Sequence, residues 1–137
     1  MTVVYYVMDG DDILVSTMAD RQKAKAVARD PRVSLCVLDE QWPLTYLQVY
    51  GTAVLDTDPE HGADMLRQVI ELMAGGPVPE ERRAQIAEMA REEKRVVVRI
   101  TPYATFATPP RHVNAMEDLD GLSHWTSASV PWRPEPE

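Results

Sequence analysis

Two hydroxyls followed by three cations give one short segment the composition of an anion-binding site. The five residues are, in chain order, Ser16, Thr17, Arg21, Lys23 and Lys25. The hydroxyls end a predicted strand and the cations begin a predicted helix, whose free backbone N–H groups would point at the same anion. Arginine supplies a bidentate fork, lysine a point charge and the hydroxyls further donors. The segment therefore predicts a site for a phosphate or another polyanion.

The charge at the start of this predicted helix is opposite to the usual preference. Each cation there opposes the helix macrodipole by a few tenths to ~1 kcal/mol. The chain has 22 acidic residues against 14 basic ones, so acids that would suit this position are plentiful. A bound anion would compensate for this unfavourable placement of the cations. The alternative, which the spacing alone leaves equally open, is that the cations form a solvated basic face.

Turn and capping residues divide the chain into short strands and helices. Asp9–Asp12 predicts a hairpin turn, Asp30-Pro31 ends the first helix and Asp58-Pro59 begins the second. Strands are expected at Val3–Met8, Ile13–Thr17, Arg32–Leu38, Leu44–Leu55 and Arg95–Ile100, the last prolonged through Ala104–Ala107. Helices are expected at 21–29, from Pro59 to the Gly75-Gly76-Pro77 stop, and at 79–93. This order predicts an antiparallel sheet or barrel with helices outside it.

Several side chains have expected structural roles. Asp20 is a candidate N-cap for the first helix, Asp39 to Pro43 is expected to be a loop, and Cys36, in an apolar run, is expected to be a small buried residue. Helical spacing predicts apolar faces toward the core, formed by Met65, Leu66, Val69, Ile70 and Met73 in one helix and by Ile86, Met89 and Ala90 in the next.

Other chemistries find little support in the sequence. The net charge of −8 argues against non-specific nucleic-acid binding. His61, His112 and His124 lack metal-ligand spacing and are expected at the surface, so no metal site is predicted. A G-x-S-x-G nucleophile elbow is absent, and no apolar run approaches the roughly 20 residues of a membrane helix. The beginning of the chain does not have the pattern of a signal peptide, and a cytoplasmic protein is expected.

Longer runs of residues resemble a known family. The run Ile13–Thr17 with the cations Arg21 and Lys23, and the following run Arg29–Leu35, resemble the pyridoxamine 5′-phosphate oxidase-like split β-barrel family. Within that family, the chain looks most like the actinobacterial PPOX-class, coenzyme F420-dependent oxidoreductases. Two weaker runs add to the resemblance, Tyr50-Gly51-Thr52-Ala53 and Arg95–Pro102. The resemblance implies a mainly β, α+β fold, an antiparallel split β-barrel like that of FMN-binding proteins, over residues 1–113.

The resemblance also implies how the chain differs from its relatives. A helix and a first strand normally precede the segment that begins at Val3, so the expected barrel lacks its usual first strand. Residues 114–137 lie outside the resemblance and are expected to form an extended, acidic, proline-containing tail.

The resemblance further implies a homodimer with a flavin-type cofactor at each subunit interface. The cofactor phosphate would be held by Thr17, Arg21 and Lys23, with Ser16 and Lys25 as additions. Tyr46 and Gln48 are expected to reach the cofactor of the other subunit.

The implied function is an oxidoreductase in which reduced coenzyme F420 passes hydride to a small cyclic or conjugated substrate. The cofactor carries the redox chemistry, so no catalytic side chain is assigned. Lys25 and Arg29 favour F420, whose polyglutamate tail extends beyond its phosphate. An FMN-binding oxidase or reductase on the same scaffold, and a non-catalytic flavin- or deazaflavin-binding protein, are the alternatives.

Overall fold

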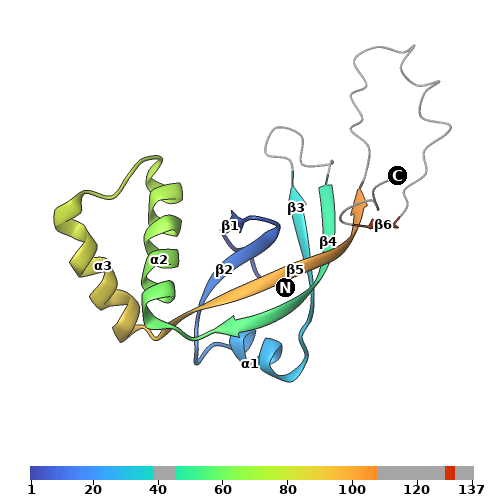
Figure 1. The fold of residues 1–137 in the computed structure, drawn as a ribbon, viewed down its shortest axis with the longest axis horizontal. Coiled ribbons are helices and arrows are strands. Elements are labelled where there is room, and N and C mark those ends of the chain that lie inside the picture. Colours follow the sequence, from blue (N-terminus) through green and yellow to red (C-terminus); the bar gives the residue numbers. More distant parts are fainter. Residues whose placement is uncertain (39–45, 108–128, 132–137) are drawn as a thin grey trace, which may run out of the picture. The chain divides into compact units, whose positions relative to one another are not determined.

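The computed structural model describes residues 1–38, 46–107 and 129–131, which form an antiparallel sheet and three helices (Figure 1). The strands are β1 (Tyr6–Asp9), β2 (Asp12–Met18), β3 (Arg32–Leu38), β4 (Tyr46–Asp56), β5 (Arg95–Ala107) and β6 (Ser129–Pro131). The helices are α1 (Gln22–Arg29), α2 (Pro59–Ala74) and α3 (Glu80–Glu92). The strand order is β1-β2-β5-β4-β3, and β6 pairs with β5. The predicted α+β class with an antiparallel sheet is confirmed.

The chain divides into two compact units. The first comprises Met1–Val33 and Thr52–Thr101, and therefore contains the β1–β2 hairpin, all three helices and the beginning of β5. The second comprises Ser34–Gly51 and the chain from Pro102 onward. The expected domain boundary between residues 113 and 114 falls outside the described residues. Within the expected tail, β6 runs antiparallel to β5.

The β1–β2 hairpin closes at the predicted turn. Asp9 and Asp12 face each other across it, and Gly10 has a φ of 60°, the left-handed region that a glycine adopts at no steric cost. Strand β2 then runs antiparallel to β5, with Leu14 opposite Arg99 and Thr17 opposite Val96. Because strand side chains alternate, one face of this ladder forms a buried core, with Ile13, Val15, Thr17, Val96, Val98 and Ile100.

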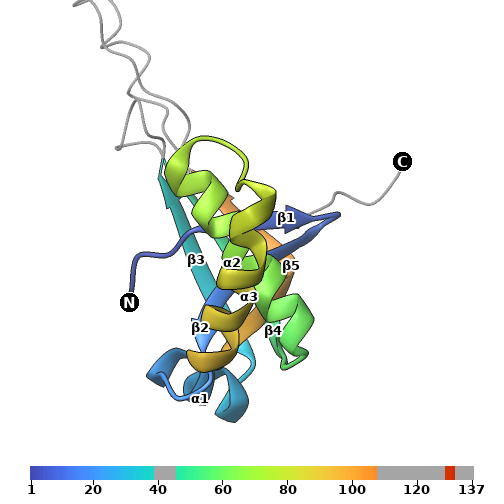
Figure 2. The same cartoon turned by 90° about the vertical axis from the view of Figure 1, so that its left-hand side faces the viewer.

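Helix α2 begins and ends as the capping residues predict. The Asp58 side chain accepts a hydrogen bond of 2.8 Å from the backbone N–H of Glu60, Pro59 occupies the first turn, and Gly75 ends the helix with a φ of 71°. Figure 2 shows α3 on the outer side of α2. Their contact is an apolar cluster of Leu66, Val78, Ile86 and Ala90, flanked by Ala63 and Ile70.

The buried faces of these two helices are narrower than predicted. Met65 and Leu66 are buried as expected, but Met73 is 64% exposed and Met89 is 37% exposed. Met73 lies on the same side of α2 as Leu66 and Ile70, but in the last turn of the helix, outside the cluster that joins α2 to α3. Sequence periodicity identifies apolar residues but does not show how much of a face a partner covers.

Two further local predictions are wrong, and one cannot be compared. The N-cap position of α1 is occupied by Arg21, which makes no side-chain capping bond, and the predicted cap Asp20 instead pairs with Lys94. Cys36 is exposed, because the side chains of β3 alternate and Cys36 lies on its exposed face, between the half-buried Leu35 and Val37. The expected loop from Asp39 to Pro43 lies outside the described residues.

No helix that the structure describes is long and apolar enough to span a membrane.

Candidate functional site

The predicted anion-binding segment is held in place by backbone hydrogen bonds at the end of β2. The N–H of Arg21 donates to the carbonyl of Met18 at 3.0 Å, which turns the chain into α1. The N–H of Ala19 donates to the carbonyl of Lys94 at 2.9 Å, and the Nζ of Lys94 lies 3.1 Å from Asp20. The loop before α1 is therefore joined to the beginning of β5, at the end of β2 away from the hairpin turn (Figure 1).

Four cations on and directly before α1 are without partners among the residues that the structure describes. They are Arg21, Lys23, Lys25 and Arg29, called here the α1 cation group. Every other described basic residue except Arg82 forms an ion pair, and Arg82 donates a hydrogen bond to Gln85. Positive charge is thus concentrated on one short helix, with no acidic residue in its first turn.

Lys23 differs from the rest of the α1 cation group in its burial. It is half-buried, next in sequence to the buried Ala24, whereas Arg21, Lys25 and Arg29 are exposed. Burial lowers the pKa of the Lys23 ammonium, because the charged form loses solvation. An anion beside Lys23 would stabilise the charged form and offset this cost.

The two predicted hydroxyls point to opposite faces of β2. Thr17 is 6% exposed, and the described residues offer its hydroxyl no hydrogen-bond partner. Ser16 is half-buried on the other face, where its Oγ accepts a long hydrogen bond of 3.5 Å from Arg95. Buried polar groups normally have partners, and Ser16 is separated from Thr17 because it lies on the other face of the strand.

Tyr46 and Gln48 lie on β4 in the second compact unit. Both are half-buried and share one face of the strand, since they are two residues apart. Their expected role at the cofactor of another subunit stays a prediction.

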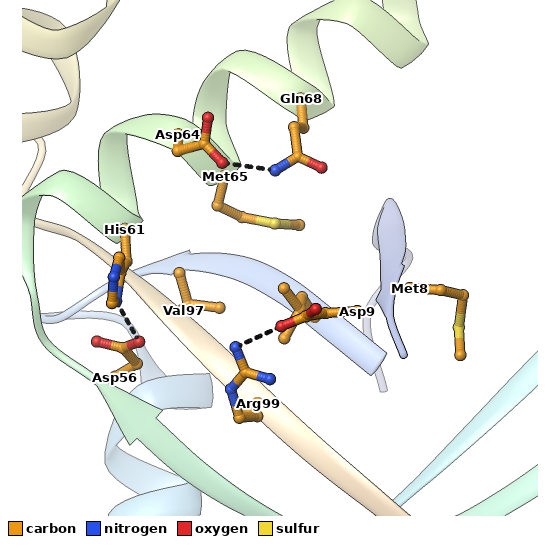
Figure 3. A pocket seen from close by; sticks show the side chains of 10 residues that line it. Met8, Asp9, Asp56, His61, Asp64, Met65, Gln68, Val97 and Arg99 are labelled. Carbon is orange, nitrogen blue, oxygen red and sulfur yellow. Dashed lines mark hydrogen bonds and ion pairs between the residues drawn. The ribbon is translucent and has the colours of Figure 1, made fainter. Parts of the chain in front are cut away.

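A separate cavity of about 330 Å³ lies in the first unit, lined by residues of α2, the β1–β2 hairpin, β5 and the end of β4 (Figure 3). His61, expected at the surface, is exposed but also lines this cavity, and its Nδ1 lies 2.7 Å from Asp56. The hydrogen bond with Asp56 raises the pKa of His61. Sequence reasoning missed this cavity because its lining comes from segments that are distant in the chain.

Comparison with known proteins identifies the family. The family model described as pyridoxamine 5′-phosphate oxidase matches residues 1–108. No curated protein matches the chain significantly.

Three solved structures are similar to this chain. One, of an F420 reductase, is 26% identical, with 74% of each chain covered and a TM-score of 0.55. Another, of a conserved hypothetical protein from Mycobacterium tuberculosis, is 32% identical, with 76% of this chain and 64% of that chain covered and a TM-score of 0.61. A protein from Listeria innocua, 17% identical over 76% of this chain and 73% of that chain with a TM-score of 0.52, shares the fold. On the strength of the match over residues 1–108, the chain belongs to the pyridoxamine 5′-phosphate oxidase family.

Proposed function

We propose that this chain is an oxidoreductase that binds reduced coenzyme F420 at α1 and uses it to reduce a small cyclic or conjugated organic substrate. The observation that carries the proposal is the α1 cation group, whose side chains have no partners in the described part of the chain. The family fold is that of flavin-binding oxidoreductases. Similarity to an F420 reductase supports the choice of cofactor.

The residues present fit the anionic end of such a cofactor. Thr17, Arg21 and Lys23 would hold the phosphate, with the buried Thr17 hydroxyl donating a hydrogen bond for which the described residues offer no other acceptor. Lys25 and Arg29 follow Arg21 at intervals of four residues, which is about 6 Å each along a helix. They form a line of exposed charge suited to the carboxylates of a polyglutamate tail.

The chain's own residues contribute position and electrostatics. When bound, the deazaflavin supplies the hydride, so no side chain is needed as a redox group. The cations neutralise the phosphate, and the joined ends of β2 and β5 fix the helix that carries them. Tyr46 and Gln48 would contact the cofactor of the other subunit in a homodimer.

Fluorescence titration of the purified full chain with F420 and with FMN tests the proposal. F420 is expected to bind, and Lys23→Ala should weaken its binding by about 1–3 kcal/mol, as for a lost charge-assisted hydrogen bond. Arg82→Ala is the matched control, since Arg82 is an exposed cation on α3 whose described partner is the neutral Gln85. Unchanged affinity in Lys23→Ala, or an equal loss in the control, would overturn the assignment.

FMN is the alternative cofactor, and one observation favours it. Only Lys23 in the α1 cation group is half-buried, so the enclosed part of the site suits a single phosphate. The double variant Lys25→Ala/Arg29→Ala separates the cofactors: it should weaken the binding of F420, which has a tail, and leave FMN almost unaffected. Binding of either cofactor without turnover of any substrate would instead indicate a carrier protein.

A further inference from the structure

The first turn of α1 has no side-chain cap, although an aspartate lies next to it. Arg21 occupies the N-cap position with extended backbone, at φ −78° and ψ 153°, and its side chain makes no capping hydrogen bond. The first N–H groups of an α-helix have no intrahelical acceptor, and the described residues supply none here. Asp20 directly precedes Arg21, and aspartate is among the best residues for supplying such an acceptor. The carboxylate that could cap α1 therefore lies one position before the cap.

Two contacts from Lys94 hold Asp20 in this position. The carbonyl of Lys94 accepts a hydrogen bond from the N–H of Ala19 at 2.9 Å, which fixes the backbone directly before Asp20. The Nζ of Lys94 lies 3.1 Å from a carboxylate oxygen of Asp20, which engages the side chain. Both the backbone and the carboxylate of this segment are thus bound by a single residue at the beginning of β5.

The backbone of Lys94 is itself constrained. Among the described residues, Lys94 is the one non-glycine with a positive φ, of 51°. Its N–H donates to the carbonyl of Arg91 at 3.1 Å, so its position is tied to the end of α3. A glycine would adopt this conformation at no steric cost, but it would have no ammonium group to pair with Asp20.

We propose that Lys94 is a positioning residue for the cofactor site at α1, because it keeps the Asp20 carboxylate off the first N–H groups of that helix. The inference rests on the proposed binding of the cofactor at α1. A capping carboxylate accepts from the second or third helical N–H, which would be those of Gln22 and Lys23 if α1 began one residue earlier. There the carboxylate would occupy the donors and place negative charge where the phosphate is expected. Lys94 prevents this competition and neutralises the carboxylate.

Titration of full-chain variants with F420 tests this role. Lys94→Met removes the ammonium group and should weaken binding roughly fivefold, the ratio that corresponds to the usual strength of an N-cap. Asp20→Ala removes the competing carboxylate and should bind at least as tightly as the unchanged chain. The double variant Lys94→Met/Asp20→Ala should bind like Asp20→Ala. A loss that persists in the double variant would overturn the proposal, because Lys94 would then act through its own charge or through the stability of the fold.

Two further variants control for charge and for the ion pair. Lys94→Arg keeps a cation that can pair with Asp20, and it should retain the affinity of the unchanged chain. Arg91→Met removes another exposed cation, three residues earlier, whose partner is Glu88 at 2.6 Å. It should leave affinity unchanged, and a loss equal to that of Lys94→Met would overturn the specific role of Lys94.

Backbone amide NMR of the ligand-free chain separates this inference from the proposed function. In Lys94→Met, the amide proton of Gln22 or Lys23 should move downfield as it gains a carboxylate acceptor, and it should return in the double variant with Asp20→Ala. Absence of this movement would overturn the positioning role, whatever the cofactor titrations show. If the unchanged chain binds neither F420 nor FMN, the proposed function fails, while the amide shifts still decide whether Lys94 keeps Asp20 from capping α1.

Discussion

Gly62 of α2 lies directly against the backbone of Arg95 at the beginning of β5. A Cβ on Gly62 would overlap the carbonyl oxygen of Arg95 and would lie 3.0 Å from its carbonyl carbon. Backbone atoms in a paired strand cannot move aside as the end of a flexible side chain can, so α2 would have to shift. The glycine thus sets how closely the helix approaches the sheet.

The first prediction follows from this contact. Gly62→Ala should lower the free energy of unfolding by about 1–3 kcal/mol, the usual cost of overpacking, as measured by urea denaturation. Gly76→Ala is the control, because a Cβ there meets no atom within 4 Å. Equal stability of Gly62→Ala and the unchanged protein would show that α2 accommodates the methyl group without strain.

The second prediction compares two aspartates that precede helices. Asp58→Ala removes the N-cap of α2 and should cost about 1 kcal/mol of stability. Asp20→Ala removes only an exposed ion pair with Lys94, and such pairs contribute about 0–1 kcal/mol. Thermal and urea denaturation of the two variants would measure how much stability each one loses. A larger loss from Asp20→Ala than from Asp58→Ala would contradict the capping assignments.

The third prediction concerns Asp30, whose pKa is lowered to about 2 by hydrogen bonds from the side chain and backbone of Arg32. Since the folded pKa is depressed, the stabilisation is complete above the ordinary value of 3.8 and is lost as the pH falls from 3.8 to about 2. Arg32→Met should raise the pKa of Asp30 toward 3.8 in a carboxyl-carbon NMR titration. The backbone N–H bond persists in this variant, so the return should be partial. A pKa that does not change would exclude the guanidinium as the main cause.

The fourth prediction concerns His61, whose pKa is raised chiefly by its hydrogen bond with Asp56. Because the folded pKa is raised, the pair stabilises the fold fully below the ordinary value of 6.5 and loses this effect as the pH rises through the folded pKa. Asp56→Asn should return the pKa of His61 toward 6.5, as followed by its ring-proton NMR signal. Glu88→Gln, on α3, serves as the charge-matched control, and an equal change there would contradict the local cause.

The elements that the sequence predicts well depend on local signals. The turn at Asp9–Asp12, the start of α2 at Asp58-Pro59 and its end at Gly75 each follow from the conformational preferences of a few adjacent residues. The predicted bounds of β3 match those of the structure, because Pro31 separates the strand sharply from α1.

The features that the sequence does not predict depend on distant partners. Asp20 pairs with Lys94, which is 74 residues further along, and so does not cap α1. The exposure of Met73 depends on how far along α2 the neighbouring residues cover the helix. The separation of Ser16 from Thr17 does not depend on a distant partner. The two-residue period of a strand already places neighbouring side chains on opposite faces.

The concentration of positive charge on α1 also has a kinetic consequence. The whole chain carries a net charge of −8, so the α1 cation group is a local exception on an acidic protein. An anion diffusing toward the protein would be attracted at this helix and repelled elsewhere, within a screening length of about 8 Å at physiological ionic strength. Capture should therefore be guided to one end of β2, and added salt should slow association more than it speeds release.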